Sequence, residues 1–274
     1  MSLVIQISDT HFGTEQPEVV NALVGLAKRL RPDLLVLSGD ITQRATSSQF
    51  KAAREFMDSL GAPMLALPGN HDIALFNGVA RLFWPYANYR KAFGEALEKV
   101  HSCRDLLVVC VNTTRAYRHR HGEVSAAQIE RVARRLQTAS AQQLRVVVVH
   151  QPMAVQRAQD AVHLVRGHAA ALQRWASAGA DIVMGGHIHL PYVMQIPALP
   201  RPMWAVQAGT AVSKRVRRGV PNSVNVLYWG RSGQTSHPDL PGGDVRIEQW
   251  DFDGALQRFT CVRETQIQPA RLLQ

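Results

Sequence analysis

The sequence predicts an α/β fold in which two β-sheets pack together and helices cover them on the outside. Up to about residue 190, short apolar runs alternate with longer segments that carry apolar residues at helical spacing. This alternation favours parallel strands joined by crossover helices. After Pro191 the helical pattern stops, and strand-like runs follow one another between turn-rich segments. These later strands are expected to form a second sheet.

The expected strands of the alternating part are short and rich in branched apolar side chains. They cover residues 3–7, 34–37, 64–67, 106–111, 145–149 and 181–184. The expected helices cover residues 17–30, 47–60, 125–138 and 167–177. The third helix begins at Ser125 with a capping box, because Gln128 follows three residues later and each side chain can bond a backbone group of the other.

Two segments depart from this alternation. Residues 73–104 carry several aromatic side chains among glycine and proline, and we expect a helical insertion there with most of the aromatics packed in or over the core. Strands are expected at 192–196, 203–207, 223–229, 245–252 and 256–262, so the C-terminal strands span about 245–262. Internal repeats, low-complexity tracts and linkers are absent from the sequence, which favours a single domain over residues 1–274.

Composition narrows the class of protein. The three cysteines are too few and too scattered for a disulfide framework, and indicate reduced core thiols: Cys103, Cys110 and Cys261. No apolar run reaches the ~18 residues that a membrane span needs. The first residues also lack the positive charge of a signal peptide. We therefore expect a cytoplasmic protein without a membrane partner.

The formal net charge is +10, and most of the basic residues are arginines. Arginine pairs with phosphate oxygens in a planar, two-pronged geometry. A basic balance fits nucleic acid, a membrane surface or a small anionic substrate. The basic residues form no long stripe and do not alternate with aromatics, so nucleic acid is not the expected partner. The sequence does not determine the oligomeric state, and a homo-oligomer is among the alternatives.

Polar residues follow directly after five of the expected strands. The carboxyl ends of parallel strands share one edge of a sheet, where ligands bind in open α/β folds. Residues far apart in the sequence are therefore expected to meet there. The five segments are Asp9-Thr10-His11, Ser38-Gly39-Asp40, Gly69-Asn70-His71-Asp72, His150-Gln151 and Gly186-His187-Ile188-His189.

These segments offer seven candidate metal ligands with oxygen or imidazole donors, a set that suits Mn, Fe or Zn. No thiolate is among them, which argues against a structural zinc site. Seven ligands are too many for one tetrahedral ion but suit two ions that share a bridging carboxylate. Two ions ~3.5–4 Å apart lower the pKa of a shared water and hold a phosphoryl group. The seven are Asp9, His11, Asp40, Asn70, His150, His187 and His189.

In this order the segments resemble the calcineurin-like metallophosphoesterases, nearest to the compact bacterial cyclic-nucleotide and glycerophosphodiester phosphodiesterases. The resemblance covers about residues 3–230. It implies a four-layer α/β-β/α sandwich of two mixed sheets flanked by helices. It further implies that Asp40 bridges two metal ions and that His71 is a catalytic histidine that contacts the scissile phosphate. The implied ligands are Asp9, His11 and His189 for one ion, and Asn70, His150 and His187 for the other.

The resemblance implies a two-metal phosphoesterase that hydrolyses a small phosphodiester by attack of a metal-bridging hydroxide. A phosphomonoesterase or a nucleotide-sugar pyrophosphatase could use the same metal pair, and a nuclease or an inactive binding scaffold is a further alternative. The scaffold is disfavoured because no ligand is missing. In the phosphoprotein phosphatases an acid pairs with the catalytic histidine, whereas Gln43 stands at that position here. Asp72 could hold His71 instead, or simply cap a turn.

Two arginine-rich runs are expected to emerge near the metal edge, because each follows a strand that ends there. One covers residues 115–121 and includes Arg115 and Arg118, and the other covers 214–219 and includes Arg215 and Arg217. They would attract charges of a substrate beyond the scissile phosphate. The alternative is a pair of solvated loops, since charge runs usually face water.

Overall fold

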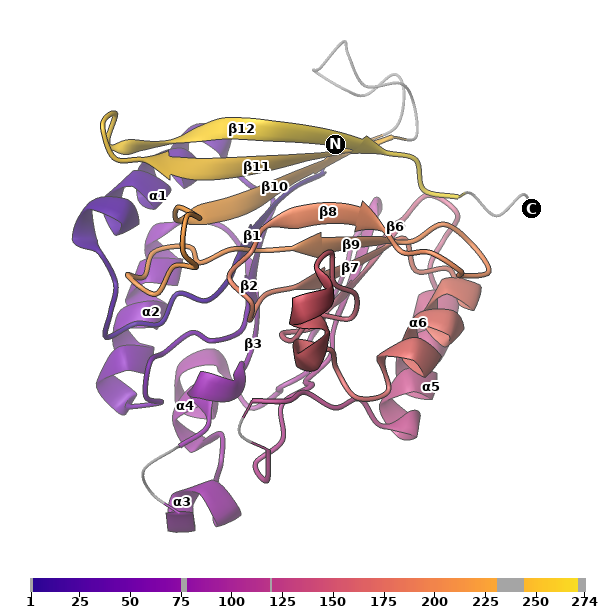
Figure 1. Ribbon diagram of the computed structural model, residues 1–274, viewed down its shortest axis with the longest axis horizontal. Coiled ribbons are helices and arrows are strands. Elements are labelled where there is room, and N and C mark those ends of the chain that lie inside the picture. The colour runs from indigo at the N-terminus through magenta and orange to yellow at the C-terminus, as the bar shows by residue number, and fades with distance from the viewer. Residues whose placement is uncertain (1, 75–77, 119, 231–243, 271–274) are drawn as a thin grey trace.

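The computed structural model describes residues 2–74, 78–118, 120–230 and 244–270. Within them the chain forms two six-stranded sheets that lie face to face, with helices on both outer sides (Figure 1). Both sheets are mixed, because each combines parallel and antiparallel neighbours. The four-layer α/β-β/α sandwich expected from the sequence is confirmed.

The first sheet has three parallel strands at one side and three antiparallel strands at the other. The parallel strands come from the N-terminal part of the chain, and the antiparallel ones from its end. The order across the sheet is β12 (Arg258–Ile267), β11 (Val245–Asp253), β10 (Ser223–Trp229), β1 (Ser2–Ile7), β2 (Leu34–Ser38) and β3 (Met64–Leu67).

The second sheet has four parallel strands in the middle and an antiparallel strand at each edge. Its order is β4 (Val100–Ser102), β5 (Leu106–Cys110), β6 (Leu144–Val148), β7 (Ile182–Gly185), β9 (Trp204–Gln207) and β8 (Tyr192–Gln195).

The expectation that the strands after Pro191 form a sheet of their own is wrong. Strand β9 runs parallel to β7 and β8 pairs with β9, so both belong to the second sheet. Strand β10 instead pairs antiparallel with β1, which adds β10, β11 and β12 to the first sheet. An apolar run indicates that a segment is extended, but not which neighbour satisfies its backbone hydrogen bonds.

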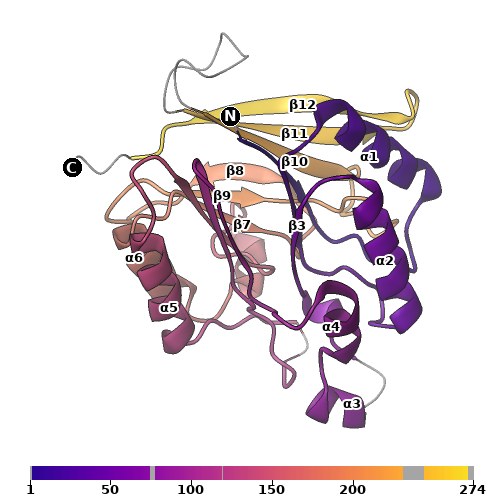
Figure 2. The same cartoon turned by 180° about the vertical axis from the view of Figure 1, so that it is seen from behind.

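Helices cover the outer face of each sheet (Figure 2). On the first sheet lie α1 (Pro17–Leu30), α2 (Ser47–Ser59) and α4 (Ala87–Phe93), and on the second lie α5 (Ala126–Gln137) and α6 (His168–Ser177). Helix α1 starts with Pro17, whose fixed φ and missing N–H suit a first helical position. At α5 the expected capping box between Ser125 and Gln128 is confirmed.

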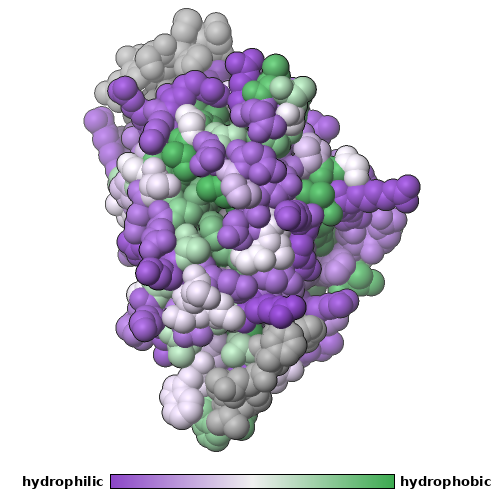
Figure 3. Space-filling model, turned by 90° about the vertical axis from the view of Figure 1, so that its left-hand side faces the viewer, coloured by the Kyte–Doolittle hydropathy of each residue, from purple (hydrophilic) through white to green (hydrophobic). Residues whose placement is uncertain are grey.

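Three apolar layers hold the sandwich together. Strand side chains alternate between them: Ile5 packs toward α1 and α2, while its neighbour Val4 packs between the two sheets. In the third layer, Trp175 of α6 is fully buried, and its Nε1 donates to the carbonyl of Ile129 in α5. Because both faces of the central strands are covered, they read as continuous apolar runs. The outer side that carries α1 and α2 is mainly hydrophilic, with small separate hydrophobic areas (Figure 3).

The segment 73–104 is more varied than its sequence indicates. It contains α3 (Gly78–Phe83) and α4, but also strand β4, which pairs antiparallel with β5. Three residues are too few to show a strand period, and the edge of the sheet supplies their partners. Tyr89 and Phe93 are buried, whereas Phe83 and Trp84 are 63% and 66% exposed, so its aromatics divide between core and surface. Residues 75–77, with Phe76, lie outside the described residues.

The cysteines follow the sequence interpretation only in part. All three are free, but Cys110 is buried while Cys103 and Cys261 are exposed, so a single one is a core thiol. Among the described residues, no helix combines the length and the apolar character that crossing a bilayer requires.

Candidate metal centre

The five polar segments lie at the carboxyl ends of β1, β2 and β3 of the first sheet and of β6 and β7 of the second. Hydrogen bonds tie them to one another. The N–H of Asp9 donates to the carbonyl of Gly39 at 3.0 Å, and the N–H of Gly186 donates to the carbonyl of His150 at 2.7 Å. Across the two sheets, Nδ1 of His150 lies 2.9 Å from the carbonyl oxygen of Ser38. The segments therefore form one site where the ends of both sheets meet.

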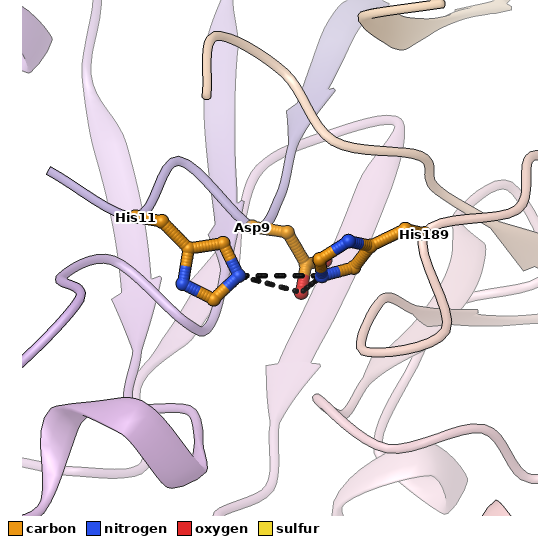
Figure 4. Close-up of side chains that lie close together, drawn as sticks. All are labelled: Asp9, His11 and His189. Carbon is orange, nitrogen blue, oxygen red and sulfur yellow. Dashed lines mark hydrogen bonds and ion pairs between the residues drawn. The ribbon is translucent and has the colours of Figure 1, made fainter. Parts of the chain in front are cut away.

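Three of the expected ligands form a first cluster (Figure 4). Oδ1 of Asp9 lies 3.2 Å from Nε2 of His189 and 3.9 Å from Nε2 of His11. The two Nε2 atoms are 3.2 Å apart. Figure 4 shows the two imidazoles and the carboxylate turned toward a common point. These are the three residues that the resemblance assigns to one ion.

Asp9 is held from both sides of the site. Oγ of Ser8 donates a hydrogen bond to Oδ2 of Asp9 at 2.7 Å, and the backbone N–H of His187 donates to the same oxygen at 3.0 Å. Such outer partners fix the direction in which a ligand presents its lone pairs. Oδ1 of Asp9 is thereby left facing His11 and His189.

A second cluster contains Asp40, His150 and His187. Nε2 of His150 lies 3.2 Å from Oδ1 of Asp40 and 3.2 Å from Oδ1 of Asn70. The other carboxylate oxygen of Asp40 lies 3.8 Å from Nε2 of His11, in the first cluster. Asp40 therefore presents one oxygen to each cluster, a geometry in which a carboxylate can bridge two ions.

The backbone is strained at five of these residues. The φ angles are 52° at Asp9, 42° at His11, 46° at Asp40, 74° at His187 and 53° at His189. Residues other than glycine rarely adopt such angles, and each instance costs on the order of 1–3 kcal/mol. The surrounding hydrogen bonds and packing must hold them in place. A concentration of strain of this kind is typical of functional sites.

Two glycines permit the close approach of the segments. Gly39 has a φ of 92°, and a Cβ at this position would overlap the imidazole of His150. A Cβ at Gly186 would overlap the hydroxyl of Ser8 and crowd the carboxylate of Asp9. Any side chain at either position would push the two sheets apart at the site.

Burial and charge set the protonation states. Burial alone raises the pKa of Asp9, but the charge and hydrogen bond of His189 outweigh it and lower the pKa to about 2. At Asp40, His150 likewise outweighs burial and holds the pKa well below its usual range. Burial, reinforced by the charge of His150, lowers the pKa of His187 to about 3. Both carboxylates are thus ionised at neutral pH and His187 is neutral, as metal binding requires.

His150 and His189 differ from these groups, because the pKa of each is raised. At His189, burial lowers the pKa, but the charge and hydrogen bond of Asp9 outweigh it. The larger effect concerns His150. Burial lowers its pKa, but the adjacent Asp40 outweighs this effect and raises the pKa to about 9. His150 must therefore give up a proton when it binds an ion.

The donor set fits two metal ions. Nδ1 of His187 is buried and has no hydrogen-bond partner among the described residues, which is costly unless a ligand binds there. The Nε2 atoms of His11 and His189 likewise lie 3.2 Å apart and face the same region (Figure 4). Nitrogen and carboxylate donors without a thiolate suit Mn, Fe or Zn. One ion per cluster would satisfy these groups.

His71 lies beside the clusters in the short 3-10 helix η1 (Asn70–Asp72). Its Nδ1 is 3.1 Å from the backbone carbonyl of Gln43, and its Nε2 is 3.2 Å from Nη1 of Arg215. Its ring meets that of His11 edge-on, with centroids 4.9 Å apart. A carbonyl oxygen only accepts, so Nδ1 of His71 carries the hydrogen in this contact.

Asp72 does not hold His71. Its carboxylate instead accepts hydrogen bonds from the backbone N–H groups of Ile41, Thr42 and Gly69, at 2.8 to 3.0 Å. Burial, together with the charge of Asp40, raises its pKa to about 6. Of the two roles considered for Asp72, the structure shows the capping role and contradicts the pairing with His71.

The four arginines expected to bind substrate occupy different places. Arg215 reaches the clusters, where its Nη1 lies 2.9 Å from Oε1 of Gln43 and 3.3 Å from Nδ1 of His11. Arg217 binds Asp160 through both terminal nitrogens, at 3.1 and 3.0 Å. Arg215 therefore contacts a candidate metal ligand directly. The sequence had predicted a loop that attracts more distant charges of the substrate.

Arg115 and Arg118 bind residues that do not belong to the clusters. Arg118 donates to Glu123 at 2.9 Å, and Arg115 lies 3.7 Å from the same carboxylate. Arg115 also donates to the carbonyls of Asn112 and Thr114. These contacts make both arginines part of the loop's own structure rather than free cations. His119 of the same run lies outside the described residues.

Sequence reasoning missed one residue of the site. Nδ1 of His163, in the 3-10 helix η2 (Ala158–His163), lies 3.3 Å from Nε2 of His187. Their rings meet at 70° with centroids 5.1 Å apart. His163 follows no strand and belongs to no motif, so the sequence carried no signal for it.

The family model for calcineurin-like phosphoesterases matches residues 2–191, which is more than half of the chain. The chain belongs to this family. The matched region includes all seven candidate ligands and His71, each in a segment that follows the carboxyl end of a strand.

Curated relatives match parts of this family member. Glycerophosphodiester phosphodiesterase GpdQ of Enterobacter lignolyticus is 37% identical over 83 residues, which are 26% of this chain and 29% of that protein. The 3',5'-cyclic adenosine monophosphate phosphodiesterase CpdA of Escherichia coli is 25% identical over 163 residues, 55% of each chain. The chain thus spans between 29% and 55% of the length of these relatives.

Solved structures share the fold over almost the whole chain. A dimetal phosphatase from Danio rerio superposes with a TM-score of 0.69, covering 98% of this chain and 99% of that one. The two sequences are 13% identical, so this likeness establishes the four-layer architecture and nothing finer.

Proposed function

We propose that this protein is a two-metal phosphodiesterase that hydrolyses a small phosphodiester of the cyclic-nucleotide or glycerophosphodiester type. The observation that carries the proposal is the position of Asp40, with one carboxylate oxygen 3.2 Å from His150 and the other 3.8 Å from His11. Two donor clusters joined by one carboxylate are the arrangement with which two ions act on a phosphoryl group. The names of the curated relatives support a diester substrate.

In this proposal each cluster holds one ion. Asp9, His11 and His189 bind the first, Asn70, His150 and His187 bind the second, and Asp40 binds both. When bound, the pair lowers the pKa of water and offsets charge on the phosphoryl oxygens. The hydrogen bonds and packing that hold the strained backbone keep the ligands in place before an ion arrives, so that little reorganisation is needed.

His71 and Arg215 act on the substrate itself. The guanidinium of Arg215 pairs with an oxygen of the scissile phosphate, a contact that its planar fork of donors favours. The side chain of Gln43 orients this guanidinium. The backbone carbonyl of Gln43 orients the ring of His71. When the guanidinium binds the phosphate, its contact with Nε2 of His71 is released. This nitrogen can then carry a proton to the leaving oxygen.

The test is a substrate panel run with Mn, Fe, Zn and Mg in turn on protein stripped of metal by chelator. Bis(p-nitrophenyl) phosphate, cyclic nucleotides, glycerophosphodiesters, p-nitrophenyl phosphate, a nucleotide sugar and single-stranded DNA separate the reaction classes. We expect no turnover without metal, recovery with Mn and a preference for small diesters. Full activity in metal-free protein would refute the metal dependence, and a preference for monoesters, nucleotide sugars or DNA would refute the substrate class.

A matched pair of variants links activity to the site. Asp40→Asn removes the charge of the bridging carboxylate with little change of shape, and is expected to abolish turnover. Asp58→Asn makes the same change at an exposed aspartate on α2 that pairs with Arg54, and is expected to be neutral. Equal activities in the two variants would contradict the assignment of Asp40.

A further inference from the structure

We propose that His163 and the Asp160–Arg217 ion pair are a positioning device that presents Nδ1 of His187 to a metal ion. The inference rests on the two-metal function proposed above and adds residues to which no role has been assigned. It also gives Arg217 a role other than substrate binding.

The first observation is the contact between the two imidazoles. Nε2 of His187 lies 3.3 Å from Nδ1 of His163, whereas Nδ1 of His187 is buried and has no hydrogen-bond partner among the described residues. A neutral imidazole carries a single N–H. If Nε2 of His187 donates its hydrogen to His163, Nδ1 keeps a lone pair for an ion. His163 thus selects the tautomer of His187 in which the unpartnered nitrogen is a ligand.

The second observation is how His163 itself is held. Helix η2 carries both His163 and Asp160, and Asp160 is buried. Its two carboxylate oxygens accept from the two terminal nitrogens of Arg217 at 3.0 and 3.1 Å. A two-pronged pair of this kind fixes orientation as well as distance. The ion pair therefore anchors η2, and His163 with it, to the loop that carries Arg217.

The third observation connects this ion pair to the ligands. Nη1 of Arg217 also lies 3.4 Å from the carbonyl oxygen of Ile188, at the long end of the hydrogen-bonding range. Ile188 stands between His187 and His189, and both of these have positive φ angles. Arg217 thus contacts Ile188, the residue between the two strained ligands. Through its ion pair with Asp160, Arg217 also holds η2 in place. Both contacts stabilise the conformation that places the two ligands.

These contacts explain why Arg217 is a poor candidate for substrate binding. Its guanidinium is committed to Asp160, a buried carboxylate that has no other ion pair within the described part of the chain. Removing one member of such a pair leaves the other buried and unpaired, which is strongly unfavourable. Arg215 differs, because its Nη1 contacts Gln43 and two histidines, and no ion pair with a carboxylate is found for it among the described residues.

The test is a Mn²⁺ titration of the metal-stripped full chain by isothermal calorimetry. The wild-type protein is expected to bind two ions. His163→Ala is expected to weaken one of the two binding events by about 10- to 100-fold, as loss of an outer partner of a ligand typically does, and to leave the other unchanged. The weakened event should be the one that His187→Ala removes. His163→Gln should restore binding, because its amide oxygen can accept the hydrogen of Nε2.

Two further variants separate positioning from a general effect on folding. His101→Ala makes the same change in strand β4, at the far edge of the second sheet, and should leave both events unchanged. Asp160→Asn keeps the shape of η2 but lacks the charge that holds Arg217, and should weaken the same event as His163→Ala. The visible absorption of Co²⁺-loaded protein should change in the affected variants and not in His101→Ala.

The outcomes distinguish the two proposals. If the wild-type protein binds two ions and His163→Ala binds both as tightly, the positioning role is refuted while the two-metal function stands. If the wild-type protein does not bind a second ion, the two-metal function fails and this inference fails with it.

Discussion

Replacing Arg215 by alanine tests how the arginine acts on the substrate. Its Nη1 lies 3.2 Å from His71 and 3.3 Å from His11, so a phosphoryl oxygen bound between the two clusters would be within reach of the guanidinium. A hydrogen bond to a charged group contributes roughly 1.5–3 kcal/mol. At about 1.4 kcal/mol per factor of ten, Arg215→Ala should lower kcat/KM by about 10- to 150-fold.

The position of Arg215 in the structure also decides for which substrates Arg215→Ala should lower kcat/KM. A loop that attracts distant charges would matter only for multiply charged substrates and would lose its effect in salt. An arginine beside the scissile phosphate should matter for bis(p-nitrophenyl) phosphate as well, at low and moderate ionic strength alike. Steady-state kinetics of Arg215→Ala on this singly charged diester provide the assay.

Two other variants sharpen this assay. Arg218→Ala removes an exposed arginine from the same loop and should be nearly neutral. Arg215→Lys keeps the charge without the planar fork and should fall between Arg215→Ala and the wild type. If Arg215→Ala has the kcat/KM of Arg218→Ala on the small diester, the placement of Arg215 on the scissile phosphate is wrong.

Three further predictions concern the ligands, the catalytic histidine and the thiols. Asp40→Ala should bind fewer than two ions even at high Mn²⁺, whereas His11→Ala should recover the second ion there; metal analysis that finds two ions in Asp40→Ala would exclude a bridge. His71→Ala should retain both ions but lose about 10²–10⁴-fold in kcat on substrates with poor leaving groups, and less on p-nitrophenyl esters; equal losses would exclude proton donation. Burial raises the pKa of Cys110 to about 12, so iodoacetamide at neutral pH should label the exposed Cys103 and spare Cys110 until the protein is unfolded. Mass spectrometry that finds both labelled at one rate in the folded protein would contradict this.

The sequence predicted the parts of the fold that depend on local pattern. Strands β1 to β3 and β5 to β7 are apolar runs covered on both faces, and each expected strand agrees with the structure within a residue or two. His150 follows β6 of the second sheet, so its contact with Asp40 required the packing of the two sheets. Because polar segments follow β1 and β2, the meeting of Asp9 and Asp40 could be inferred from strand ends alone. The regular relation between strand direction and sheet edge made this possible.

The remaining features depend on partners far away in the sequence. Pairing of β10 with β1, rather than with β9, follows from packing that no local pattern records. The arginine runs show the same limit, because Arg215 and Arg118 look alike in sequence, yet the first lies at the metal centre and the second pairs with Glu123. Arg217 and Asp160 are separated by 57 positions, and no sequence motif links the two.

The ligands of each proposed ion come from both sheets. In the first cluster, His11 extends from the first sheet and His189 from the second, and the two stand 178 positions apart in the chain. An ion bound by both would link distant points of the folded chain, and unlike a covalent cross-link it can be removed by a chelator. Binding to the folded state alone at 100 times Kd would add about 2.7 kcal/mol of stability. The same ions that serve hydrolysis would then also act as a reversible staple between the two halves of the sandwich.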